Sequence, residues 1–398
     1  MKLFITILAL ASMAIAEDES SDKLLIAGNN RLTAKMFAEV VKTKPNESIV
    51  LSAFSVLTPL ALLSQAAVGP SHDELLRAIG MPSDETTKQV FGQVNKKLRS
   101  VKGVELKQAN RLYIPKSYKL NEDYEAIARD VFDSEVKNVD FSKNVETAKE
   151  INTWVESQTN NRIKDLVKAR SLTSDTKVVL VNAIYFKGQW KEKFNPNDTV
   201  DRDFHVTKDK TIKVPTMYKK ANFLYSECKD LDAKFLRLPY VGDEASMLII
   251  LPNQVDGLAA LEEKLKDPEA ITRATSDMFE REVEVRLPKF KIETEINLKD
   301  VLKAIDVNML FDFTKAKLNK LLKGENDLFV SDAIQKAFIE VNEEGAEAAA
   351  ANEFIAVAAA PLLPVRPLIF TVDRPFYFGI DILGRKIFTG TNWFTKNK

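Results

Sequence analysis

The chain has 398 residues, of which 45% are hydrophobic and 29% charged, and 57 basic residues balance 57 acidic ones. The 23 Phe and many aliphatic residues exclude an intrinsically disordered chain, because they supply a large core. The balanced charge gives no reason to expect nucleic acid or a membrane surface as the main partner.

The first residues, MKLFITILALASMAIA, have the organisation of a secretory signal peptide. Lys2 precedes an apolar run, and Ala14-Ile15-Ala16 supplies small residues for cleavage. The run is too short to span a membrane comfortably. We therefore predict that residues 1–16 are removed and that the mature chain, 17–398, is secreted and extracellular.

The mature chain has two further features that suit a secretory route. Cys228 is its single cysteine, and we interpret it as a free thiol. The sequons Asn46-Glu47-Ser48 and Asn197-Asp198-Thr199 make Asn46 and Asn197 candidate glycosylation sites, although patterns this short also arise by chance.

Helical patterns dominate the first part of the chain. An apolar stripe runs from Leu32 to Val41. Residues 71–74, SHDE, predict a capping box at the start of a second helix. A third helix is expected from about Asn144 to Val167.

Strand patterns follow. Residues 178–186, VVLVNAIYF, are apolar on both faces apart from Asn182 and predict a central buried strand. Residues 282–292 alternate with period two and change phase across Pro288, which predicts a bulge or kink. Residues 246–252 predict a strand, and residues 375–388 a hairpin that turns near Gly384. This irregular mixture favours an α+β class in one large domain.

Few residues suggest catalysis. His72 and His205 are the only histidines, and the sequence has no zinc-type Cys/His spacing, phosphate-binding glycine loop or Gly-x-Ser-x-Gly elbow. A Ser-His-Asp hydrolase stays formally open, because its members need not be adjacent in sequence. We interpret both histidines as structural and expect no enzyme activity, metal or cofactor.

A basic segment allows two interpretations. It forms either a weak glycosaminoglycan site or, more simply, the solvated face of a helix. Its members are Lys88, Lys96, Lys97, Arg99 and Lys102.

A run of small side chains stands out at 342–361, NEEGAEAAAANEFIAVAAAP. Alanine is the best helix former, so a helix is one interpretation. A strand, in which alternate residues share a face, fits better. Glu347 and Glu353 both have odd numbers, so they lie on one face and the other face carries no charge. With Gly345 as a flexible pivot, the run is predicted to be a spare strand, small enough to slide between existing strands.

This run resembles the hinge of the inhibitory serpins. EEGAEAAAA follows FVSDAIQKAFIEVN as that hinge does in the family. The segments NESIVLSAFSVLTPLALLSQAA, LVNAIYFKGQWKEKFNPNDTVDRDFHV, RLPKFKIETEINLKDVL and DRPFYFGI also occur in family order. The resemblance covers essentially the whole mature chain, and it looks closest to insect haemolymph antielastase serpins of the alaserpin type.

The resemblance implies one serpin domain, 17–398, with three β-sheets, about nine helices and an exposed reactive-centre loop at about 343–367. It implies a monomeric inhibitor that traps a serine protease as a covalent 1:1 complex when the cut loop inserts into the main sheet. A hinge of small side chains enters the sheet without overpacking it. The implied hinge residues are Glu343, Gly345, Ala346, Glu347, Ala348, Ala349, Ala350 and Ala351.

The family's spacing also implies the reactive bond. Counting fourteen positions from Gly345 gives Ala359–Ala360, which suits an elastase-like protease and puts Ala356, Val357 and Ala358 in the preceding subsites. Counting back from the RPF motif points near Pro364 instead. We prefer the forward count, because insertion is measured from the hinge. Bonds at other residues would suit trypsin-like (Arg366) or chymotrypsin-like (Phe354, Leu362, Leu363) proteases.

Two more family sites carry over. Ser52, Ser55 and Asn182 match the shutter beneath the sheet, where Gln335 replaces the family's histidine and Ala53 its usual proline. Lys289 and Glu343 match the basic and acidic partners of the breach, where insertion begins. The alternative is a non-inhibitory serpin that acts as a carrier, chaperone or storage protein; the small hinge residues favour an inhibitor.

Overall fold

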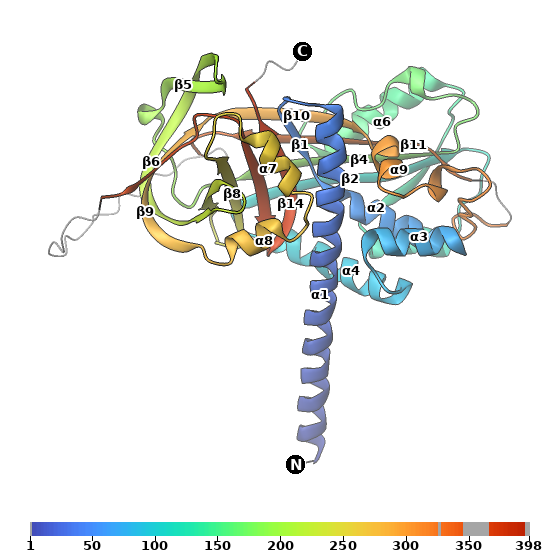
Figure 1. Ribbon diagram of the computed structural model, residues 1–398. Helices are drawn as coiled ribbons and strands as arrows, with labels where there is room; N and C mark the ends of the chain where they lie inside the picture. The colour runs from blue at the N-terminus through green and yellow to red at the C-terminus, as the bar shows by residue number, and fades with distance from the viewer. Residues whose placement is uncertain (1, 325–327, 345–365, 395–398) are drawn as a thin grey trace.

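Two β-sheets organise the part of the chain that the structure, a computed structural model, describes: residues 2–324, 328–344 and 366–394 (Figure 1). The larger sheet has nine strands: in spatial order β1 (Ile49–Leu51), β14 (Arg385–Asn392), β13 (Phe376–Ile382), β8 (Ala245–Pro252), β7 (Ala233–Pro239), β6 (Lys210–Cys228), β9 (Phe279–Pro288) and β12 (Leu368–Thr371), with β5 (Val200–Thr207) paired to β6. The smaller sheet has five: β10 (Phe290–Asn297), β11 (Val330–Val341), β4 (Val178–Gly188), β2 (Val104–Pro115) and β3 (Glu135–Val139).

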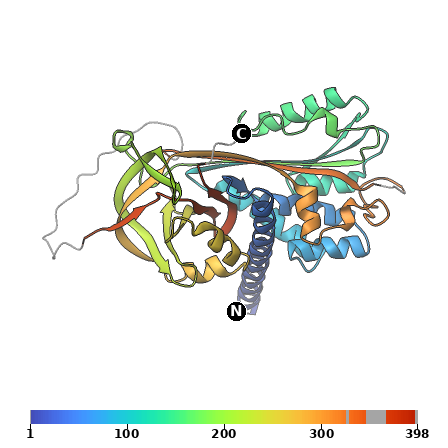
Figure 2. The same cartoon turned by 45° about the horizontal axis from the view of Figure 1, so that its top comes forward.

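Helices cover both faces of the five-stranded sheet. Helices α2, α3, α4 and α9 lie on one face and α6 lies on the other (Figure 2). The α-helices of the described residues are α1 (Lys2–Thr43), α2 (Ala53–Ala66), α3 (Pro70–Ile79), α4 (Asp84–Ser100), α5 (Glu122–Asp130), α6 (Asn144–Gln158), α7 (Leu258–Lys264), α8 (Ala270–Thr275) and α9 (Leu298–Ala304). Three short 3-10 helices are η1 (Ala169–Ser171), η2 (Pro196–Asp198) and η3 (Met309–Phe311).

The expected α+β architecture is confirmed, with one difference in how the sheets are counted. Strand β6 is 19 residues long; it pairs with β5 and β9 first and with β7 only over Leu224–Cys228. Because a single strand carries these pairings, two of the three expected sheets are continuous in hydrogen bonding within the described residues.

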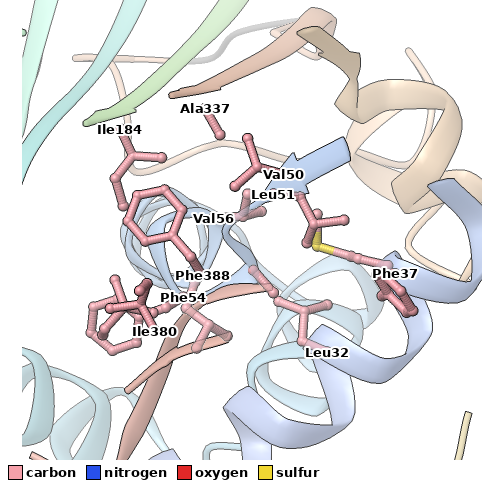
Figure 3. Packing of buried hydrophobic residues seen from close by; sticks show 14 of the residues in the cluster. Leu32, Phe37, Val50, Leu51, Phe54, Val56, Ile184, Ala337, Ile380 and Phe388 are labelled. Carbon is pink, nitrogen blue, oxygen red and sulfur yellow. The ribbon is translucent and has the colours of Figure 1, made fainter. Parts of the chain in front are cut away.

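The main core lies between the first two helices and both sheets. Leu32 of α1, Phe54 of α2 and Ile184 of β4 converge there with Phe388 of β14 (Figure 3). All of α2 is buried, which explains why it carries an unbroken mixture of apolar and small residues rather than one apolar stripe. The core therefore fixes α2 against the underside of the strands that hold the site described below.

The strand predictions are confirmed, except at Pro288. β4 is the middle strand of the smaller sheet, and the β13–β14 hairpin turns through Leu383 and Gly384, which both have positive φ (50° and 73°). At Pro288 we expected a bulge or kink. Instead the chain leaves the larger sheet there and begins β10 of the smaller sheet at Phe290, so the change of phase marks a change of sheet.

Two helix predictions need correction. The third helix ends at Gln158 rather than near Val167, because Asn160 and Asn161 adopt left-handed backbone (φ 51° and 57°). The capping box is wrong as well: α3 begins at Pro70, so Ser71 lies buried inside it, and Glu74 accepts from the backbone amides of Asn308 and Met309 instead.

Helix α1 starts within the predicted signal peptide and projects from the body at its N-terminal end (Figure 1). Its polar contacts include Asp22, whose Oδ1 lies 2.6 Å from the buried guanidinium of Arg385. Cleavage after Ala16 would leave this contact in place, so removal of residues 1–16 stays a prediction compatible with the fold. Among the helices of the described residues, none combines the length and apolar character of a membrane span.

Candidate functional site

A row of buried amides crosses three neighbouring strands of the smaller sheet. Asn110 of β2, Asn182 of β4 and Gln335 of β11 are direct register partners. Gln335 Nε2 donates to Asn182 Oδ1 at 2.7 Å, and Asn182 Nδ2 donates to Asn110 Oδ1. Since Asn182 and Gln335 are fully buried, these bonds form away from water and hold β11, β4 and β2 together.

The N-terminus of α2 completes this network from below. Gln335 Nε2 donates to the Ser52 carbonyl at 2.8 Å, and its Oε1 accepts from the Ser52 amide at 3.2 Å. Ser55 Oγ donates to Asn182 Oδ1 at 2.8 Å, and Asn182 Nδ2 donates to the Ser55 carbonyl at 2.9 Å. Ser52 also caps α2 by accepting from the Ser55 amide.

The structure thus brings together all four predicted shutter residues and adds Asn110. Sequence reasoning missed Asn110, because it stands among polar neighbours, Gln108 and Arg111, and so lacks the local signal that marks Asn182. Amides and hydroxyls do not ionise in the ordinary pH range. The cluster of Ser52, Ser55, Asn110, Asn182 and Gln335, which we call the shutter, is therefore electrically neutral.

The predicted breach pair is in contact at the end of β11. Lys289 Nζ lies 2.8 Å from Glu343 Oε2, and Thr199 Oγ1 donates to Glu343 Oε1 at 2.8 Å. Burial acts to raise the pKa of Glu343, but the hydrogen bonds from Lys289, the backbone and Thr199 outweigh it and hold the pKa below its usual range. Thr199 entered the sequence reasoning only as part of a sequon.

Aromatic residues fix the backbone next to this pair. Trp190 Nε1 donates to the Asn342 carbonyl at 2.9 Å, the Trp190 amide donates to Glu344 O at 3.2 Å, and the Phe194 amide donates to Glu343 O at 3.0 Å. The Trp190 ring stacks on Tyr240, with centroids 4.5 Å apart and an 11° interplanar angle. The three residues that precede Gly345 are therefore anchored, and the breach includes Trp190 and Phe194, which sequence reasoning did not assign.

The strands that flank this region run in the same direction. β11 and β4 are parallel and paired from Val330–Val178 to Ile339–Phe186. A segment that doubles back after β11 would run antiparallel to both if it entered between them, and antiparallel pairing is the more stable kind. The parallel pairing of β4 and β11 would therefore let a strand between them pair antiparallel with both neighbours.

The rest of the predicted loop lies outside the described residues. This holds for the hinge residues Gly345, Ala346, Glu347, Ala348, Ala349, Ala350 and Ala351, for Ala356, Val357 and Ala358, and for the bond Ala359–Ala360. The described chain resumes at Arg366 and soon enters β12, which pairs in parallel with β9 at the edge of the larger sheet.

The remaining candidates have ordinary surroundings. His72 contacts Asp84 at 2.8 Å and His205 contacts Thr211 at 3.0 Å, which agrees with structural roles. The described residues contain no group of three side chains suited to a metal ion. Two of the basic side chains face carboxylates: Lys97 lies 3.7 Å from Asp22, and Arg99 lies 3.0 Å from Asp133. These contacts favour a solvated helix face.

Both sequons lie at the surface. Asn46 and Asn197 are exposed, but the hydroxyl residue of each sequon has a partner in the fold. Ser48 Oγ donates to Asn392 Oδ1 at 3.0 Å, while Thr199 binds Glu343. The occupancy of either site stays a prediction.

Comparisons with known proteins agree with this architecture. Residues 27–388 match the family model described as serpin (serine protease inhibitor). The chain is 55% identical to alaserpin of Manduca sexta, and the alignment covers 98% of this chain and 99% of that protein. In Bombyx mori, antitrypsin is 51% identical (98% and 99% covered) and antichymotrypsin-2 is 53% identical (91% and 96% covered). The crystal structure of Serpin48 of the insect Tenebrio molitor, described as highly specific, superposes with a TM-score of 0.85 at 36% identity, covering 94% of this chain and 99% of that one.

Proposed function

The chain belongs to the serpin family of serine protease inhibitors, and from this premise we propose that it is a secreted monomer that traps its target protease covalently. The serine of the protease attacks the carbonyl of Ala359 and forms an ester as the amide bond to Ala360 breaks. The loop released by the cut then inserts between β4 and β11 and carries the attached protease with it. The basic face of α4 has no part in this proposal.

The parallel seam between β4 and β11 is the observation that carries this proposal. A strand inserted here would replace the one ladder between β4 and β11 with two, one on each side of the new strand, so the sheet would gain a ladder in total. The native state is then metastable, because the arrangement with the loop inserted has a lower free energy. The shutter beneath the seam and the breach at its end resist the separation of β11 from β4 before the cut.

The target class depends on the loop rather than on overall similarity. Relatives at 51% and 53% identity bear names that refer to trypsin and to chymotrypsin. Ala359 presents one methyl group, which suits the small S1 pocket of elastase-like proteases. Arg366 is a poor alternative bait, because β12 begins at Leu368 and holds the backbone that a protease cleft would need to bind.

The test is incubation with pancreatic elastase, followed by denaturing electrophoresis and sequencing of the released C-terminal peptide. We expect a complex stable in detergent and a peptide that begins at Ala360. Ala359→Arg should move inhibition to trypsin-like proteases. A peptide with another first residue would relocate the bait bond, while complete cleavage without a complex would favour the non-inhibitory alternative.

Processing is tested separately. The protein secreted by a eukaryotic cell should begin at Glu17 and should elute as a monomer in size-exclusion chromatography. Retention of residues 1–16 would contradict the predicted signal peptide.

A further inference from the structure

The two sequons occupy different places relative to the reactive loop. Asn197 lies exposed in η2, two residues before Thr199, whose hydroxyl donates to Glu343 at the breach. Asn46 lies in the turn after α1, and Ser48 of its sequon binds Asn392 and the Trp393 amide at the end of β14. Of the two sequons, the one at Asn197 is hydrogen-bonded to Glu343, the residue that starts the loop.

We propose that Asn197 carries an N-linked oligosaccharide and that this glycan shields the breach from the reactive loop of a second copy of the chain. The inference rests on the proposed function in two respects: the chain passes through the secretory pathway, and a loop segment is able to enter the seam between β4 and β11. The identity of the target protease does not matter to it.

The modification is a simple group transfer. Nδ2 of Asn197 forms a bond to the anomeric carbon of an oligosaccharide carried by a polyprenyl diphosphate. The bond from that carbon to the diphosphate oxygen breaks, the lipid diphosphate leaves with the electron pair, and the amide loses one proton to a base of the transferase. The reaction takes place on the unfolded chain, so the Thr199 hydroxyl serves the sequon first and Glu343 after folding.

The position of Asn197 makes steric exclusion selective. It lies two positions before Thr199, a span of at most about 7 Å, so a glycan on the exposed Asn197 side chain would occupy the solvent beside Glu343. The chain's own loop is tethered at Glu344 and reaches the seam as an intramolecular segment at high effective concentration. A loop from a second copy has the same sequence but must arrive through the volume that the glycan occupies.

The shield would not hinder the protease. Ala359 lies fourteen residues beyond Gly345 and, in an extended loop, up to about 45 Å from it. The glycan therefore acts on insertion from another molecule and leaves attack on the bait bond unchanged.

Occupancy is tested first, on the protein secreted by insect cells. Trypsin should release residues 194–202, bounded by Lys193 and Arg202. Enzymatic deglycosylation in heavy-oxygen water should convert Asn197 to labelled aspartate in this peptide. An unmodified peptide in the secreted protein overturns the proposal.

The shield is tested with a fluorescent peptide that has the sequence of residues 345–358, GAEAAAANEFIAVA. Asn197→Gln should incorporate this peptide about threefold faster or more than the glycosylated protein, as loss of an excluded volume predicts. Asn46→Gln is the matched control and should not change the rate. Equal rates for the glycosylated protein and Asn197→Gln overturn the shield. If Asn197→Gln fails to fold, enzymatic deglycosylation of the folded protein makes the same comparison.

Two further measurements separate the causes. Thr199→Ser keeps both the sequon and a hydroxyl near Glu343 and should incorporate the peptide at the wild-type rate. Thr199→Val loses both and should incorporate it at least as fast as Asn197→Gln. Inhibition rates should be the same with and without the glycan. If the wild-type protein, as secreted, inhibits no protease, the proposed inhibitory function fails. The occupancy and peptide results still decide the inference on Asn197.

Discussion

Gln335 and Asn182 lie opposite each other on β11 and β4, and Gln335 Nε2 donates to Asn182 Oδ1 at 2.7 Å. Both side chains are fully buried, so no water competes for this bond. The pair sits in the seam where we propose that the loop inserts, and insertion would have to break it. Since neither amide ionises, the shutter should resist opening equally across the ordinary pH range.

Gln335→His should introduce a pH dependence that the native chain lacks at this site. Burial disfavours the imidazolium, so the folded-state pKa of the new side chain should fall below its ordinary value of about 6.5. The native state then binds fewer protons than the unfolded state, and stability falls as the pH drops below about 6.5. Calorimetry between about pH 7 and pH 5 should show this loss relative to wild type.

Gln335→Leu is the control for that experiment. It removes the same hydrogen bonds and should lower the free energy of unfolding by about 1–3 kcal/mol. This loss should not vary with pH. If the histidine and leucine variants share one pH profile, the imidazole does not titrate in the shutter and the argument from burial fails.

Glu343→Gln should lower the stability of the protein mainly at neutral pH and have little effect in acid. The folded-state pKa of Glu343 lies below its ordinary value of 4.5, so its stabilisation is fully present above that value and is lost as the pH falls through the folded-state pKa. Because Lys289 is partly exposed, we expect only about 1 kcal/mol at neutral pH.

Thermal unfolding at neutral pH and near pH 3 checks this expectation. The variant should melt below wild type at neutral pH and approach it in acid. The same substitution in a Lys289→Met background should cost less, because the partner is already gone. A difference that grows on acidification would contradict the assigned direction of the Glu343 pKa.

The sequence predicts the shutter better than its surroundings, for physical reasons. One polar residue in an otherwise apolar strand marks Asn182, and resemblance supplies Gln335. Alternation of apolar and polar residues predicts which face of a sheet a residue occupies, but not which sheet its strand joins. The change of phase at Pro288 therefore predicts a kink where the structure has a change of sheet. Thr199 fits a sequon so well that its bond to Glu343, 144 positions away, has no local signal.

Trp190→Phe should loosen the base of the loop while keeping its packing. A phenyl ring can still stack on Tyr240, but the donor to the Asn342 carbonyl is lost, at a cost of about 1 kcal/mol. Amide hydrogen exchange should therefore accelerate at residues 342–344. Trp154→Phe is the control, because Trp154 contacts Arg111 beneath α6 instead; acceleration at 342–344 in that variant would show that the effect is not local.

Ala346→Arg should convert the inhibitor into a substrate. In a period-two strand Ala346 and Glu347 face opposite ways, and only one of these faces is free of charge. An arginine on the inward face would have to be buried between β4 and β11 without a partner, so insertion should stall and the acyl-enzyme should hydrolyse.

The number of inhibitor molecules consumed per protease trapped should then rise by about tenfold or more, because burial of an unpaired charge is far more costly than the strand pairing gained. Glu347→Arg places the same side chain on the outward face and should leave that number close to wild type. Titration of elastase activity with each variant gives the ratio directly. If both arginines have equal effects, charge repulsion or loop chemistry rather than the inward face is responsible; if neither has an effect, residues 346 and 347 do not enter the seam.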